Sequence, residues 1–135
     1  MTAHPVSLEL TMLGCAIALV LVQITLQAAS RAPFLSPATL MGSRDTANVI
    51  DNKYVGRIDR ALRNVLETFP LFAAAVLGVV AAGRTSSSTA HGAEIYVWAR
   101  TLYVPAYISG IPFLRTIIWG VSIAGIVMIL WQLLA

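Results

Sequence analysis

The sequence predicts an all-helical membrane protein, folded as a bundle of four transmembrane helices. Of its 135 residues, 58% are hydrophobic and only 11% are charged, whereas soluble domains carry about a quarter of charged residues. Four apolar stretches approach the roughly 20 residues that are needed to cross the hydrocarbon core of a bilayer. Most of the Lys and Arg residues fall between Arg31 and Arg63, which is typical of a cytoplasmic loop between two membrane helices.

The first expected span covers about residues 8–29. No Lys or Arg precedes it and Arg31 follows it directly, so the stretch is expected to be a membrane anchor and not a cleaved signal peptide. A long connection, about residues 30–57, comes next. Its positive charge places it in the cytoplasm, so both termini of a four-span chain are expected on the non-cytoplasmic side.

The second span is expected at about residues 58–83, and its first two turns are basic and polar. The third covers about 93–111 and the fourth about 113–135, with a tight turn marked by Gly110 and Pro112 between them. We expect the whole chain, 1–135, to form a single membrane domain of this kind.

Small residues recur every four positions in two of the spans. Ala74, Gly78 and Ala82 do so in the second span, and Gly120 and Ala124 in the fourth. Small side chains at this spacing allow helix backbones to approach closely in a membrane, so both stretches are expected to lie at helix contacts.

Two rows of polar residues interrupt the apolar spans at helical spacing. Arg60, Asn64 and Glu67 share one face of the second span. The third span carries a second row, formed by Tyr96, Arg100, Tyr103 and Tyr107. Because charged groups inside a bilayer are costly and mark functional sites, the two rows are expected to face each other.

The antiparallel order of the spans brings Glu67 and Arg100 to similar depths. It also gathers Arg60, Arg63, Tyr107 and Arg115 at the cytoplasmic mouth of the bundle, which suits an anionic ligand that carries an amino group. Arginines bind carboxylates bidentately, a carboxylate can hold an ammonium group, and a nearby arginine favours the thiolate form of a thiol.

A purely structural interpretation of these residues is also open. Glu67 and Arg100 could form a buried ion pair that fixes helix register, and Arg57, Arg60 and Arg63 could serve only as topology determinants. Asp59 is then expected to pair with Arg63, four positions later on the same helix.

Several other kinds of site are not expected. Cys15 is the only cysteine, so the chain cannot form an internal disulfide, and we expect this residue to serve in packing. His4 and His91 lack neighbours at metal-ligand spacing, so no metal site is expected. No basic repeat or base-reading motif indicates nucleic acid.

The segment RALRNVLETFP at residues 60–70 closely resembles the signature of the MAPEG family, the membrane-associated proteins in eicosanoid and glutathione metabolism. The segment WARTLYVPAY at residues 98–107 is similar to a second motif of that family. Chain length and the long first loop match as well, and the resemblance is strongest to the members of the bacterial inner membrane.

This resemblance implies a homotrimer with a glutathione site between neighbouring subunits that opens to the cytoplasm. It assigns glutathione contacts to Arg60, Arg63, Asn64 and Glu67 of one chain. Tyr103 and Tyr107 would come from the adjacent chain, with Arg100 as an intramembrane structural or site residue. Arg115, near the start of the fourth span, corresponds to the arginine that activates the thiol in catalytic members.

The leading hypothesis is therefore a glutathione transferase or peroxidase that acts on a lipophilic electrophile or hydroperoxide arriving from the membrane lipid. The main alternative is a non-catalytic scaffold of the same fold that binds a lipid or a metabolite. A small transporter or channel component is a third possibility, but the sequence lacks the inverted repeats of transporter folds.

Overall fold

The computed structural model describes residues 6–42 and 50–135 of the chain. These residues fold into helices with short connections and contain no strand. In order they are α1 (Leu8–Arg31), the 3-10 helix η1 (Ala32–Phe34), α2 (Pro37–Met41), α3 (Lys53–Ala81), α4 (Ser87–Ser109) and α5 (Pro112–Leu134). The prediction of an all-helical fold is confirmed.

Local sequence signals explain where the long helices begin and end. The side chains of Ser7, Asn52 and Ser86 accept hydrogen bonds from backbone N–H groups in the first turns of α1, α3 and α4, as N-cap residues do. Helix α4 ends at Gly110, which has a left-handed backbone with φ of 80°, a conformation that glycine adopts without strain. Pro112 then occupies the first position of α5, where its missing N–H is not needed.

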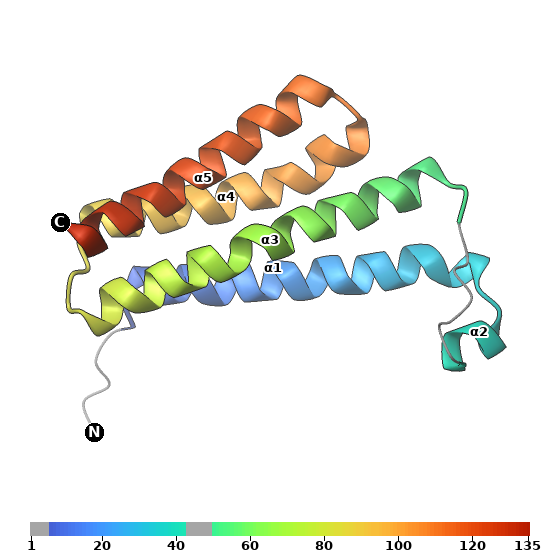
Figure 1. Cartoon of the computed structure of the whole chain (residues 1–135), viewed down its shortest axis with the longest axis horizontal. Coiled ribbons are helices and arrows are strands. Elements are labelled where there is room, and N and C mark those ends of the chain that lie inside the picture. Colours follow the sequence, from blue (N-terminus) through green and yellow to red (C-terminus); the bar gives the residue numbers. More distant parts are fainter. Residues whose placement is uncertain (1–5, 43–49) are drawn as a thin grey trace.

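The four long helices of the described chain run antiparallel to their sequence neighbours (Figure 1). Helices α4 and α5 form one closely packed hairpin, and α1 and α3 lie against each other beside it. The short helix α2 and the turn between α4 and α5 lie at one end of the molecule. The start of α1 and the end of α5 lie at the opposite end.

The main core lies where all four long helices meet. Phe72 of α3 and Tyr96 of α4 are both fully buried there, and their rings stack with centroids 4.0 Å apart. The side chains of Leu13, Ala16, Ala75, Val76, Val79, Ala93, Ile126 and Ile129 complete this cluster. A smaller cluster nearer the α2 end contains Ala61, Tyr103 and Tyr107. The bundle therefore has a large, mostly apolar core shared by all four long helices and a smaller cluster with two tyrosines toward the α2 end.

Three helical segments of the described chain are long and apolar enough to cross a membrane, judged by length and composition. They are Leu8–Phe34, Lys53–Ala81 and Pro112–Leu134. Many large apolar side chains in their middles face outward, among them Leu21, Val22, Ile117 and Val127. Helix α4 is not among the three, because Ser, Thr, His, Glu and Arg residues interrupt its apolar sequence.

The helices extend beyond the apolar stretches from which the spans were predicted. Helix α3 already begins at Lys53, inside the region expected as a loop, and α4 begins at Ser87. The expected loop also contains η1 and α2. His4, which was considered as a metal ligand, lies outside the described residues, as does Arg44 of the expected basic loop.

Two expectations about packing were wrong. Cys15 is exposed on the outer face of α1 instead of serving in the core. Gly120 has no neighbour within 4 Å of where a Cβ would lie, and Ala124 is exposed. These residues therefore face outward from the single chain, because α5 turns a different stripe toward its neighbours.

The closest helix contact lies instead between Gly92 of α4 and Gly125 of α5. A Cβ atom on Gly125 would come within 2.6 Å of the Gly92 carbonyl oxygen, and one on Gly92 within 2.8 Å of the Gly125 oxygen. Both glycines are buried. The two backbones thus approach so closely that only glycine fits on each side.

Candidate functional site

The polar residues at the α2 end of the bundle connect the start of α3 with the end of α4. Arg57 of α3 reaches across, and its Nη1 donates a hydrogen bond of 2.8 Å to the carbonyl oxygen of Ile108. Its guanidinium also lies over Gly110, where any Cβ would come within 2.6 Å of Nη2. Arg57 thereby binds one of the carbonyl groups that the end of α4 leaves without an intrahelical partner.

Next to this contact, Tyr107 is held between two arginines. The Nε of Arg60 donates a hydrogen bond of 3.2 Å to the Tyr107 hydroxyl. The Cζ of Arg115, at the start of α5, lies 5.2 Å from the centroid of the Tyr107 ring, within the range of a cation–π contact. Three predicted site residues from three helices therefore meet, although Arg60 is 47 residues from Tyr107 in the sequence.

Tyr107 and Tyr103 form the buried side of this group. Their ring centroids are 5.6 Å apart and the rings are tilted by 51°. Both side chains are buried, whereas Arg60 and Arg115 are exposed. The site is thus lined by tyrosine rings on its buried side and by arginine side chains on its exposed side.

Arg100 lies deeper in the bundle and is only 1% exposed. Its Nη1 donates a hydrogen bond of 2.6 Å to Oδ1 of Asn64 on α3. The rings of Tyr96 and Tyr103 lie on either side, with centroids 5.6 Å and 5.2 Å from Cζ. Two of its buried nitrogens, Nε and Nη2, have no hydrogen-bond partner. The guanidinium is therefore stabilised by one amide and two aromatic faces.

The possible Glu67–Arg100 ion pair is absent from the described part of the chain, where Arg100 bonds Asn64 instead. Asn64 is half-buried, while Glu67, one helical turn later, is exposed. The two residues differ by three positions, which turns their side chains about 60° apart on a helix. Arg63 is exposed as well, so both charged side chains point outward from the single chain.

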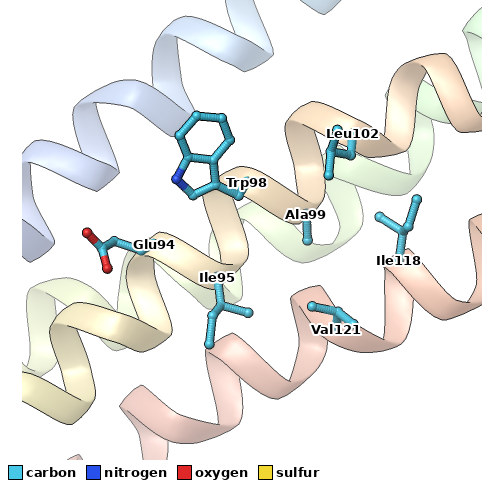
Figure 2. A pocket seen from close by; sticks show the side chains of 7 residues that line it. All are labelled: Glu94, Ile95, Trp98, Ala99, Leu102, Ile118 and Val121. Carbon is cyan, nitrogen blue, oxygen red and sulfur yellow. The ribbon is translucent and has the colours of Figure 1, made fainter.

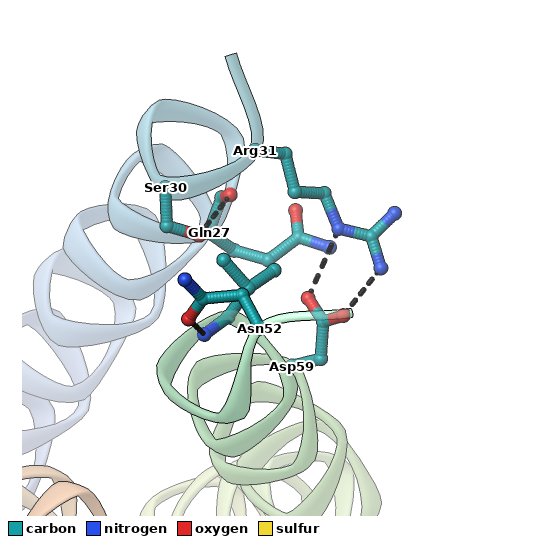
Figure 3. A network of polar contacts seen from close by, with 6 residues as sticks. Gln27, Ser30, Arg31, Asn52 and Asp59 are labelled. Atoms are coloured by element: carbon teal, nitrogen blue, oxygen red, sulfur yellow. Dashed lines mark hydrogen bonds and ion pairs between the residues drawn. The ribbon is translucent and has the colours of Figure 1, made fainter. Parts of the chain in front are cut away.

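The expected pair between Asp59 and Arg63 was also wrong. Asp59 binds Arg31, the last residue of α1, through both carboxylate oxygens (Figure 3), and the Arg31 Nε–Oδ1 distance is 3.2 Å. The close packing of α1 against α3 brings these two residues together. A bidentate contact between helices is stronger than a flexible pair along one helix, so Asp59 links the two helices.

Sequence reasoning missed two polar contacts in this region. Arg57 was regarded as a topology determinant only, yet it binds the end of α4. The sequence assigns no contact to Thr68, whose buried hydroxyl lies 3.2 Å from the Tyr96 hydroxyl. The sequence did contain a signal for the Arg57 contact. Gly110 marks a turn, and a turn glycine leaves room for a large side chain over the backbone.

The charge balance of this end indicates what it can bind. In residues 6–42 and 50–135 the only ion pair is Arg31–Asp59, so Arg60, Arg63 and Arg115 have no carboxylate partner. Glu67 is the single exposed carboxylate on the same helical face as Arg60 and Asn64. Several guanidinium groups and one carboxylate can together bind an anionic ligand that also carries an ammonium group.

Comparison with known proteins identifies the family of the chain. The model of the MAPEG family matches residues 9–135, nearly the whole chain. A search of curated proteins gives no match to the chain. The family match includes every helix that forms the arginine and tyrosine site, and it confirms the resemblance noted in the sequence. The chain belongs to the MAPEG family, and it is a membrane protein of that glutathione and eicosanoid metabolism family.

Proposed function

We propose that this protein binds glutathione at the α2 end of the bundle and uses it as a co-substrate. The observation that carries the proposal is the arrangement of Arg60 and Arg115 around Tyr107. Glutathione has two carboxylates, one ammonium group and one thiol. The unpaired arginines match the carboxylates, and Glu67 matches the ammonium group.

In the proposed reaction, Arg115 and the Tyr107 hydroxyl stabilise the thiolate of bound glutathione. A positive charge beside a thiol favours its ionised, nucleophilic form. Attack of the sulfur on a lipophilic electrophile forms a thioether and expels the leaving group, which is transferase chemistry. With a lipid hydroperoxide the thiolate takes the terminal oxygen and releases the alcohol. A second glutathione then forms the disulfide and water, which is peroxidase chemistry.

We further propose that the site is completed by a second copy of the chain in a homotrimer. Glu67 and Arg63 face outward from the single chain, and an unpaired charge in contact with lipid costs roughly 2.5–3.5 kcal/mol on insertion scales. A neighbouring subunit that covers this face of α3 would shield both groups.

The proposed membrane arrangement has four spans, with α4 as the third. The basic end with α2 faces the cytoplasm of a bacterial inner membrane, and both termini lie on the other side. The asymmetric charge supports this orientation, because Arg31, Arg57, Arg60, Arg63 and Arg115 belong to the same end. Apolar substrates can then enter from the lipid, while glutathione comes from the cytoplasm.

Calorimetric titration of the detergent-purified protein with glutathione tests the binding. We expect saturable binding that is lost in Arg60→Ala and in Glu67→Gln, because each variant removes one charge contact. Arg84→Ala, at the opposite end of the bundle, is the matched control and is expected to bind normally. Absence of binding up to millimolar glutathione would contradict the proposal.

A non-catalytic scaffold remains the second candidate, because Asn64 and Arg100 bond each other and so act in helix packing. Arg115→Ala separates the two functions. If the protein is an enzyme, Arg115→Ala is expected to lose turnover but keep glutathione binding and assembly. If it is a scaffold, Arg115→Ala is expected to change neither binding nor assembly. Arg100→Ala is expected to impair assembly in the scaffold. Turnover is followed with a model electrophile and with a lipid hydroperoxide.

A further inference from the structure

A cavity lies on the outer face of the α4–α5 hairpin, and one of its wall residues, Ile118, also packs against the cluster of Ala61, Tyr103 and Tyr107. It has a volume of about 500 Å³, within the roughly 300–1,000 Å³ that is typical of ligand pockets. Its walls are Ile95, Trp98, Ala99 and Leu102 of α4 with Ile118 and Val121 of α5 (Figure 2), and Glu94 is its one charged residue.

The cavity has a polar end and an apolar end. Glu94 lies seven residues from the start of α4, and Leu102 lies eight residues farther along, about 12 Å away at 1.5 Å per residue. Figure 2 shows the Glu94 carboxylate pointing away from the Leu102 end, as helical side chains lean toward the helix N-terminus. Glu94 and Leu102 lie about equally far from the two ends of α4, so a ligand that fills the cavity has its polar group on the side of the helix start and its apolar part across the helix middle.

Glu94 lacks a cationic partner in the described part of the chain, where Arg31–Asp59 is the only ion pair. Two basic residues of this end are engaged elsewhere. Arg84 donates a hydrogen bond of 3.0 Å to the carbonyl oxygen of Leu133, and Nδ1 of His91 lies 2.6 Å from the carbonyl oxygen of Ser87. A carboxylate beside lipid is costly without a cation, so charge complementarity calls for a cationic group at this end of the cavity.

We propose that the cavity holds one acyl chain of a phospholipid whose primary ammonium headgroup pairs with Glu94, as in phosphatidylethanolamine. The polar end of the cavity faces the end of the bundle with the chain termini, where the headgroups of one leaflet lie, and the apolar end lies past the middle of α4. A lipid of the adjacent leaflet has the same orientation. Trp98 is 65% exposed beside the cavity and borders the bound chain. This lipid site is independent of the proposed glutathione site.

Quenching of Trp98 fluorescence by brominated lipids tests the proposal. The full chain carries Trp119→Phe and Trp131→Phe, so that Trp98 is the only tryptophan, and is reconstituted in phosphatidylcholine vesicles. Brominated phosphatidylethanolamine, phosphatidylglycerol or phosphatidylcholine is then added at increasing mole fraction. We expect half-maximal quenching at about two- to fivefold lower mole fraction for phosphatidylethanolamine, since an accessible ion pair contributes about that factor.

Variants separate the headgroup contact from the groove itself. Glu94→Gln is expected to abolish the preference for phosphatidylethanolamine, whereas Glu67→Gln, the same change at an exposed carboxylate outside the cavity, keeps it. Val121→Phe fills the cavity and is expected to weaken quenching by all three lipids, which provides a test that does not depend on Glu94.

Three results would overturn the proposal. Equal quenching by the three headgroups would show that only the acyl chain matters, and a preference that survives Glu94→Gln would place the headgroup elsewhere. Absence of quenching by any lipid would mean that a second copy of the chain covers the cavity.

Discussion

Arg100 shows how much a single residue in this bundle depends on its neighbours. It is a guanidinium with 1% exposure, and among its buried nitrogens only Nη1 has a hydrogen-bond acceptor, the Oδ1 of Asn64. The two tyrosine rings beside it lower the cost of its charge. Loss of the Asn64 acceptor is therefore expected to destabilise the protein.

We predict that Asn64→Ala destabilises the protein by about 1.5–3 kcal/mol, the contribution of a hydrogen bond to a charged group. Thermal unfolding in detergent measures the effect. Arg63→Ala changes the neighbouring, exposed residue and serves as the control, because we expect it to unfold near the temperature of the unmodified protein. Equal unfolding temperatures for the two variants would show that the Asn64–Arg100 bond has no importance for stability.

The polar rows could be predicted from the sequence, but their partners could not. Helical spacing is enough to place Arg60, Asn64 and Glu67 near one face of α3. Which of them meets Arg100 depends on the rotation and depth of two packed helices, and a shift of about 60° decides between Asn64 and Glu67. Periodicity contains no information on such a small rotation.

At the scale of elements, the hairpin of α4 and α5 depends on the contact between Gly92 and Gly125. We predict that Gly125→Ala destabilises the protein by about 1–3 kcal/mol, the usual effect of overpacking. The added Cβ would lie 2.6 Å from one backbone oxygen and 3.0 Å from the backbone nitrogen of Tyr96. Backbone atoms of two helices cannot move aside as a side chain can.

Gly120→Ala is the matched control on the same helix, because its added Cβ meets no atom within 4 Å. This variant is expected to be as stable as the unmodified protein or slightly more stable, since alanine favours a helix over glycine. Thermal unfolding of Gly125→Ala and Gly120→Ala measures the two changes in stability. A larger loss of stability in Gly120→Ala would show that the outward face of α5 is a tight subunit contact.

The contact between α1 and α3 gives a second prediction at this scale. Arg31 and Asp59 form a bidentate contact, but the Arg31 side chain is 42% exposed. A double-mutant cycle is therefore expected to give a coupling energy of only about 0.2–1 kcal/mol. The cycle combines Arg31→Ala with Asp59→Ala and measures thermal unfolding. The same cycle with Arg63→Ala in place of Arg31→Ala is expected to give no coupling.

Hydropathy located the apolar part of each element better than it located the helix ends. Helix α3 begins at Lys53 because Asn52 caps it and its hydrogen bonds continue through polar residues. Small-residue spacing likewise failed to identify the close contact, because Gly92 and Gly125 lie on different helices and only their packing brings them together.

At the scale of the whole molecule, the antiparallel order of α3, α4 and α5 followed from the short connections between them. Composition and length identify α1, α3 and α5 as candidate spans, but α4 carries the buried polar residues of the site. A helix that buries polar groups against its neighbours can cross a membrane without an apolar sequence.

Cysteine labelling tests whether α4 crosses the membrane and which way the bundle faces. In a Cys15→Ser background, Thr85→Cys lies just before α4 and Ser109→Cys at its end, and both positions are exposed. A membrane-impermeant maleimide added to intact spheroplasts is expected to label Thr85→Cys at once. It should label Ser109→Cys only after permeabilisation, because the basic end is proposed to face the cytoplasm. If both positions react in intact spheroplasts, or neither does, α4 does not cross. Labelling of Ser109→Cys alone would mean that the bundle is inverted, with the arginine site away from cytoplasmic glutathione.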